Sequence, residues 1–279
     1  MSSILTNTSA MNALSTLRNV NNNLSETQSR ISTGMKVNSA KDNASYFSIS
    51  TTMKSEIGMN KAINEGMALA KSSISTARLG AETVQDLAKQ FVDRAAFAQE
   101  TGVDLAMVEK ELTALSEQMT TAIEKSTFNG ENLLSGTASK VVTTGASRDS
   151  AGAISTTTQS FTEHDLATVA TTFGTIATAI GAAGDQATLE SELAKAGVEL
   201  KSVIAAATEF GIAEKSIETQ QNFLNELTDR LDSGVGAMID ADMEQEAARL
   251  QSLQVQQQLA TQSLSIANQA PQNILSLFR

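Results

Sequence analysis

Hydrophobic side chains along most of the chain recur at alternating steps of three and four residues, which is the spacing of a coiled-coil seam. Gly34 follows the first such run, and glycine is the residue found most often just after a helix end. The spacing therefore predicts an amino-terminal helix with one packing face, although two positions of that face are polar. These positions are Ala10, Leu14, Leu17, Asn21, Leu24, Gln28 and Ile31.

Two much longer seams follow, one from Ile49 to Ala98 and one from Leu189 to Leu231. At a rise of ~1.5 Å per residue, the first would extend for about 75 Å, so it must pack lengthwise against another long helix. The sequence therefore predicts an antiparallel coiled-coil rod. We expect its core to contain Met53, Ile63, Met67, Ile74, Val84, Phe91, Leu193, Leu200, Val203, Phe210, Ile217, Leu224 and Leu231.

The region between the two seams changes in character. Gly102 ends the first seam, and a shorter helix from Val108 to Ala122 is expected to fold back on it. Residues 135–186 are rich in Ser and Thr, and within them 141–144 and 154–161 are expected to pair as a β-hairpin. The uncharged stretch 166–184 has the length of a membrane span, but its large side chains form a single stripe, which favours a packed helix.

Both chain termini carry very little charge. Residues 250–278 contain no charged side chain, and the first charged residue of the chain is Arg18. A solvated helix normally carries charges on its outer face, so these helices are expected to be surrounded by other protein copies and to order on assembly. Pro271 predicts the end of the last helix. The predicted packing residues are Leu14, Leu17, Leu24, Ile31, Leu250, Leu253, Leu259, Leu264, Ile266, Leu275, Leu277 and Phe278.

Composition excludes most chemistry. Cysteine and tryptophan are absent, histidine occurs once, and the formal net charge is −11. We therefore expect no catalytic, metal or cofactor-binding residue, no cofactor and no nucleic-acid partner. His164 lacks a nucleophile and is expected in the first turn of a helix capped by Thr162. The acidic segment from Asp240 to Glu246 has no calcium-loop spacing and favours a helix N-cap. The first residues show no secretory signal, so export would need another route.

Four segments resemble parts of the bacterial flagellin family. Residues 31–44, ISTGMKVNSAKDNA, resemble its amino-terminal signature, and residues 240–244, DADME, with 267–279, ANQAPQNILSLFR, resemble its carboxy-terminal signature. Residues 126–130, STFNG, resemble the family's turn after the second rod helix. Together the matches cover about residues 1–136 and 187–279. The segment from Lys89 to Ala96 departs from the Arg-Glu-Leu-containing stretch of many flagellins, which argues against recognition by the vertebrate innate receptor.

The resemblance implies a mainly α fold: a long antiparallel coiled-coil rod with a small β-hairpin, and paired terminal helices. Residues 1–42 with 240–279 would form the terminal assembly domain, and 43–239 the rod. It also implies a non-enzymatic subunit that leaves the cell by type III export and polymerises into the extracellular flagellar filament. Implied partners are other copies, the export apparatus and its chaperone, the cap, and hook–filament junction proteins. Ser and Thr residues of the middle region are candidate O-glycosylation sites.

Three other classes share part of the pattern. A hook–filament junction adaptor would have similar termini, but the close carboxy-terminal match and the full rod favour a flagellin. A signalling coiled coil would need a clear membrane span or sensor domain. An enzyme would need converging polar groups where this chain has heptads.

Overall fold

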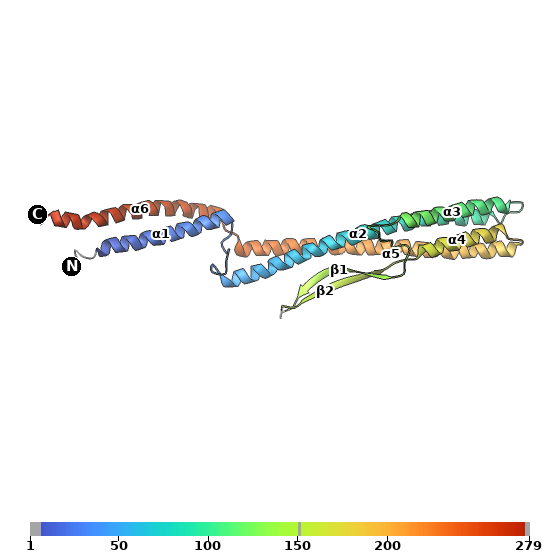
Figure 1. The fold of residues 1–279 in the computed structure, drawn as a ribbon, viewed down its shortest axis with the longest axis horizontal. Helices are drawn as coiled ribbons and strands as arrows, with labels where there is room; N and C mark the ends of the chain where they lie inside the picture. The colour runs from blue at the N-terminus through green and yellow to red at the C-terminus, as the bar shows by residue number, and fades with distance from the viewer. Residues whose placement is uncertain (1–6, 150–151, 277–279) are drawn as a thin grey trace. The chain divides into compact units, whose positions relative to one another are not determined.

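The computed structural model describes residues 7–149 and 152–276. Over these ranges the chain forms six helices and one antiparallel two-stranded sheet (Figure 1), which confirms the predicted fold class. The chain divides into two compact units: the terminal unit, residues 1–57 with 230–279, and the rod unit, residues 58–229. The elements are α1 (Thr8–Thr33), α2 (Ala44–Phe97), α3 (Leu105–Lys125), β1 (Ser139–Arg148), β2 (Ile154–Thr162), α4 (Leu166–Gly181), α5 (Gln186–Ile239) and α6 (Met243–Ser276).

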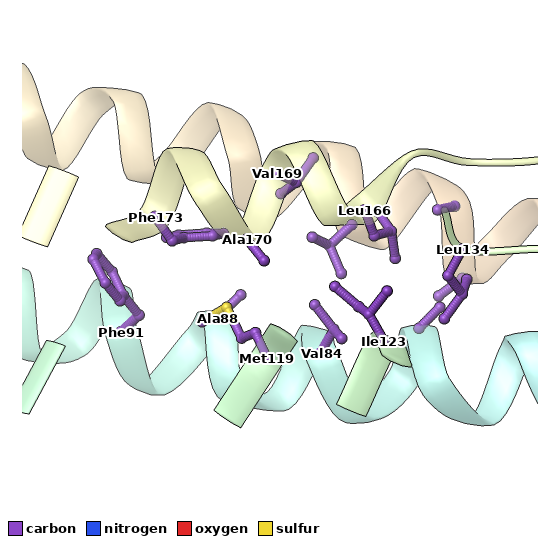
Figure 2. Close-up of a cluster of buried hydrophobic side chains, with 14 of the residues drawn as sticks. Val84, Ala88, Phe91, Met119, Ile123, Leu134, Leu166, Val169, Ala170 and Phe173 are labelled. Carbon is purple, nitrogen blue, oxygen red and sulfur yellow. The ribbon is translucent and has the colours of Figure 1, made fainter. Parts of the chain in front are cut away.

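The core of the rod unit lies between α2, α3, α4 and α5. Figure 2 shows its centre, where the rings of Phe91 and Phe173 meet edge to face with centroids 4.7 Å apart. Burial of such aromatic pairs is a major stabilising term in a helical core. Of the predicted core residues, Ile63, Leu193 and Leu200 pack partly buried against this cluster. Fully within it are Met67, Ile74, Val84, Phe91, Val203, Phe210, Ile217 and Leu224.

The predicted rod residues Met53 and Leu231 lie instead in the terminal unit. They are partly buried against a second, smaller cluster that consists of Val37, Ile57, Val235 and Ile239. The first residues of α2 and the last residues of α5 therefore belong to the terminal unit, although they follow the same heptad seams as the rest of these helices.

Turn chemistry sets the helix ends. Gly34 caps α1 with a left-handed φ of 72°, and its amide donates to the carbonyl of Arg30. Gly102, with φ 90°, lies between α2 and α3, and the side chain of Asp104 then caps α3. These positions need a positive φ that glycine adopts at little steric cost. The predicted turn after α3 is also present, since Phe128 and Glu131 exchange backbone hydrogen bonds of 2.9 and 3.0 Å.

The β-hairpin lies along the rod unit. Val142 and Phe161 pack against the rod core, so the inner face of the hairpin contacts the rod through apolar side chains. The amide of Gln159 donates to Ser216 of α5 over 2.9 Å, and Gln220 donates to the carbonyl of Thr144 over 3.1 Å. The strands were predicted correctly, but β1 extends further at both ends, and it continues past an irregularity in the register between Thr143 and Gly145.

α4 contains most of the uncharged stretch 166–184, which has the length of a membrane span. Leu166, Phe173 and Ile180 are buried in the rod core. In the described ranges, no helix combines the length and hydropathy that a bilayer crossing requires.

Two predicted helix boundaries are wrong. α4 begins after Asp165, not with His164 in its first turn and Thr162 as cap, because the Asp165 carboxylate accepts the amide of Thr168 and Thr162 still belongs to β2. α6 does not end at Pro271 but continues to Ser276. A proline inside a helix removes one backbone hydrogen bond, because proline has no amide N–H.

Candidate assembly site in the terminal unit

α1 and α6 lie side by side and antiparallel (Figure 1), and each contributes one heptad face to their contact. Along α1 the inward positions step by three and four residues, and α6 follows the same rule. Such spacing is the geometry of a two-helix coiled coil. The inward positions are Ala10, Ala13, Leu17, Val20, Leu24, Thr27 and Ile31 of α1, and Glu246, Leu250, Leu253, Gln257, Ala260, Leu264 and Ala267 of α6.

The predicted packing residues fall into three groups. Leu17, Leu24, Ile31, Leu250, Leu253 and Leu264 lie in the α1–α6 contact. Leu14, Leu259 and Ile266 do not pack in this helix pair, since they are 37%, 62% and 65% exposed, and their role in polymerisation stays a prediction. Leu275 lies in α6 with its side chain outside the described part, and Leu277 and Phe278 lie outside the described residues altogether.

The error in α1 is one of heptad frame. Sequence reasoning placed Leu14, Asn21 and Gln28 on the packing face, whereas the structure uses Ala13, Val20 and Thr27, each one residue earlier. The replaced set contains two amides, and the observed set contains none. Greater weight on avoiding buried amides would therefore have selected the observed frame.

Polar contacts hold the pair in one antiparallel register. The side-chain amide of Gln257 donates to Asn21 Oδ1 over 2.8 Å, and that of Asn7 donates to the carbonyl of Ala267, also over 2.8 Å. At the other end, the Arg30 guanidinium lies 3.3 Å from Glu246, whose side chain is nearly buried. A buried carboxylate without a cation would be costly, so Arg30 permits Glu246 to lie in the seam.

The amino-terminal and carboxy-terminal sequence signatures meet where α1 ends and α6 begins. The amide of Lys36 donates to the carbonyl of Ile239 over 2.7 Å, and that of Ala241 donates to the carbonyl of Gly34 over 2.8 Å. The resemblance in both termini thus corresponds to one local backbone pairing. It brings the end of α1 next to the start of α6.

Two carboxylates stabilise this segment. Asp42 accepts the amides of Asn38 and Ser39 over 3.0 and 2.9 Å, and these hydrogen bonds hold the pKa of its carboxyl below the ordinary value. Asp242 accepts the amides of Glu244 and Gln245 at the start of α6. The acidic segment is therefore a helix cap, and no cluster suited to a metal ion occurs among the described residues.

A second stripe on α6 lies next to the seam but has no partner within the described chain. Its positions also follow steps of four and three, and all are exposed: Ala248, Ser252, Val255, Leu259, Gln262 and Ile266. The large members Val255, Leu259 and Ile266 are 56%, 62% and 65% exposed. Beside it, a groove of about 430 Å³ runs between Ala13 and Val20 of α1 and Ala260 of α6. This surface is suited to packing against helices.

His164 has a structural place in the rod unit. Its Nε2 lies 2.8 Å from Glu209, and its ring meets that of Phe210 edge to face, so it joins the base of the hairpin to α5.

Comparison with known proteins agrees with this architecture. The model of the bacterial flagellin N-terminal helical region matches residues 4–139, and that of the C-terminal helical region matches residues 193–278. A flagellin of Brucella melitensis biotype 1 is 38% identical, and flagellin A of Rhizobium meliloti strain 1021 is 32% identical, each over the full length of both chains. A structure described as a flagellar hook-associated protein from Vibrio parahaemolyticus is similar in fold, with a TM-score of 0.57 and 15% identity over 71% of this chain and all of that one.

A pair of terminal helices with exposed apolar surface, together with a helical rod unit, is the architecture of a structural protein that packs through its helices. The matches at both ends narrow the class further. The chain belongs to the bacterial flagellin family, whose members are structural subunits of the extracellular flagellar filament that serves motility.

Proposed function

We propose that the terminal unit is the assembly domain of this flagellin and that the exposed stripe of α6 packs against other copies of the chain. The exposure of Val255, Leu259 and Ile266 on one uncharged helix surface carries the proposal. Complete burial of one aliphatic side chain of this size contributes about 1.5–3 kcal/mol. Repeated along every subunit, the stripe would supply a large part of the free energy of polymerisation.

The predicted terminal residues keep distinct roles in this proposal. Leu17, Leu24, Ile31, Leu250, Leu253 and Leu264 hold α1 and α6 together within a subunit. Leu14, Leu259 and Ile266 contact neighbouring subunits. Leu275, Leu277 and Phe278 extend the same surface toward the chain end. Pairing within the chain and packing between chains then use different heptad faces of the same helices.

Ordering of the terminal helices accompanies assembly in this proposal. Helix formation by isolated segments is marginal in water, and helices in proteins depend on packing of an apolar face. Along α1 and α6 the buried apolar side chains in the described part are Val20, Leu253 and Ala260. Such a small buried contact supports the proposal that α1 and α6 become stable helices only when further copies cover the outer stripe.

Family membership supports a wider set of partners. We propose that the subunit travels unfolded through the flagellar type III export apparatus with an export chaperone, and that it contacts cap and hook–filament junction proteins. A chain without cysteine is suited to this route, since no disulfide must be broken or formed on the way. The subunit performs no catalysis, and the exposed hydroxyls of β2 at 155–158 are candidate O-glycosylation sites.

Seeded polymerisation followed by electron microscopy tests the assembly role. Replacement of Val255, Leu259 and Ile266 together by Gln should abolish filaments while the rod unit keeps its helicity by circular dichroism. The matched control replaces Gln254, Gln258 and Ser265 by Ala, which changes the next exposed face of α6 and should leave polymerisation intact. Removal of residues 250–279 should also abolish filaments and leave a soluble rod. Normal filaments from the chain with the three Gln substitutions, or from the chain that lacks residues 250–279, would contradict the proposal.

A further inference from the structure

Asn7 makes two contacts at the start of α1. Its side-chain oxygen Oδ1 accepts the amide of Ala10 over 3.0 Å, which is the ordinary action of a helix N-cap. Its side-chain nitrogen Nδ2 donates to the backbone carbonyl of Ala267 in α6 over 2.8 Å. One amide group therefore satisfies a free amide of α1 and a carbonyl of α6 at once.

The carbonyl of Ala267 needs such a donor because of the residue four positions later. In an α-helix the carbonyl of residue 267 would accept the amide of residue 271. Residue 271 is the single proline of the chain, which has no amide N–H, and α6 nevertheless continues through it to Ser276. Proline thus leaves one carbonyl unpaired in mid-helix, and Asn7 supplies the missing hydrogen bond from the other terminus.

The arrangement also fits the register of the helix pair. The Asn7–Ala267, Asn21–Gln257 and Arg30–Glu246 contacts are spaced along the two helices in one antiparallel register. Elsewhere in the contact the side chains are aliphatic or small, and such faces tolerate a shift of a whole heptad more readily than a directed hydrogen bond does. A shift would leave the carbonyl of Ala267 without its donor.

From this geometry we infer that Asn7 is a positioning residue for assembly. It couples the start of α1 to the carbonyl of α6 that Pro271 leaves without a donor, and it fixes the register of the terminal pair. The inference rests on the proposed role of that pair in polymerisation. The hydrogen bond that α6 lacks at Ala267 is then completed only when the start of α1 lies beside it.

Hydrogen exchange of filaments, read by mass spectrometry, tests the inference. Asn7→Asp keeps the capping oxygen and removes the donor, so peptides that cover residues 8–14 should stay protected while those that cover 264–276 exchange about fivefold faster. Asn7→Ser removes the same donor without adding charge and should give the same pattern. Asn7→Ala loses both contacts and should raise exchange at both sites.

The decisive control is Pro271→Ala, which restores an amide that can pair with the carbonyl of Ala267 within α6. In that background, Asn7→Asp should no longer change exchange at 264–276, a result that loss of a helix cap alone would not produce. Equal effects of Asn7→Asp in both backgrounds, or no effect in either, would overturn the inference. Electron microscopy of the unaltered chain is read first: absence of filaments overturns the assembly role, whereas normal filaments with Asn7-independent exchange overturn the Asn7 link alone.

Discussion

The rod unit and the terminal unit are both built from long helices with heptad seams, but they bury very different amounts of apolar surface. In the rod unit, four helices enclose large side chains such as Phe91, Phe173 and Phe210, which are 0–1% exposed. Along α1 and α6 in the terminal unit, two helices bury little more than Val20, Leu253 and Ala260. The difference supports the proposal that the terminal helices depend on neighbouring copies, whereas the rod unit has a buried core of its own.

The largest effect is expected in the rod core. Phe91→Ala removes an aromatic ring that packs edge to face on Phe173 and should lower the free energy of unfolding by about 3–5 kcal/mol. Thermal unfolding of the soluble chain by circular dichroism measures it. Phe223→Ala is the matched control, because that ring is 57% exposed and its loss should change stability by less than about 0.5 kcal/mol.

An equivalent truncation in the terminal unit should behave differently. Leu253 is 6% exposed in the α1–α6 contact, so Leu253→Ala should weaken the filament, with a cost of about 2 kcal/mol per subunit. The main unfolding transition of the soluble chain, which reports the rod, should not move. Depolymerisation temperature and soluble-chain unfolding are measured side by side, and an equal loss in both would remove the contrast between the units.

Glycines of α2 sharpen the picture of rod packing. A Cβ at Gly80 would clash with Ser126 Oγ and lie 2.7 Å from Leu134 Cδ1, so Gly80→Ala should destabilise the rod by about 1–3 kcal/mol. At Gly66 nothing lies within 4 Å, and Gly66→Ala should stabilise the helix by about 0.5–1 kcal/mol. Opposite signs in chemical denaturation are the expected result. Two changes of the same sign would contradict the close approach at Gly80.

The smallest effect concerns the cap of α4. Hydrogen bonds from the side chain and the amide of Thr168 lower the pKa of Asp165. A carboxyl with a lowered folded pKa stabilises the fold above its unfolded pKa of about 3.9, and the contribution is lost as pH falls through the folded value. Asp165→Ala should cost about 1 kcal/mol near neutral pH and less in acid. Asp165→Asn keeps an acceptor that does not titrate, so its stability difference from Asp165→Ala should not fall in acid.

Sequence periodicity predicted the long helices well because a seam of many heptads repeats the same signal. It was less accurate where a single residue determines the heptad frame or the end of a helix. In α1 a frame with Leu14 and a frame with Ala13 have nearly the same spacing, and only the choice of partner face separates them. At Pro271 local propensity predicted a helix end, but a side chain from the opposite terminus, Asn7, compensates for the missing amide. A contact between residues so distant in sequence leaves no periodic signal.

The outer stripe of α6 was predicted only in part for a related reason. Leu259 and Ile266 were assigned to packing because they are apolar and regularly spaced, yet the same spacing describes a face toward α1 and a face toward another copy. Sequence alone does not say which helix covers which stripe. The structure separates the two faces within one chain, and the filament contact of the second remains a proposal.

Hydrogen exchange of the soluble chain against the assembled filament tests the central claim most directly. The account predicts fast exchange for peptides of α1 and α6 in the soluble chain and strong protection of both in the filament, while α2 between residues 67 and 97 is protected in both states. Strong protection of α1 and α6 in the soluble chain, unchanged on assembly, would contradict it, because the terminal helices would then be stable without neighbouring copies.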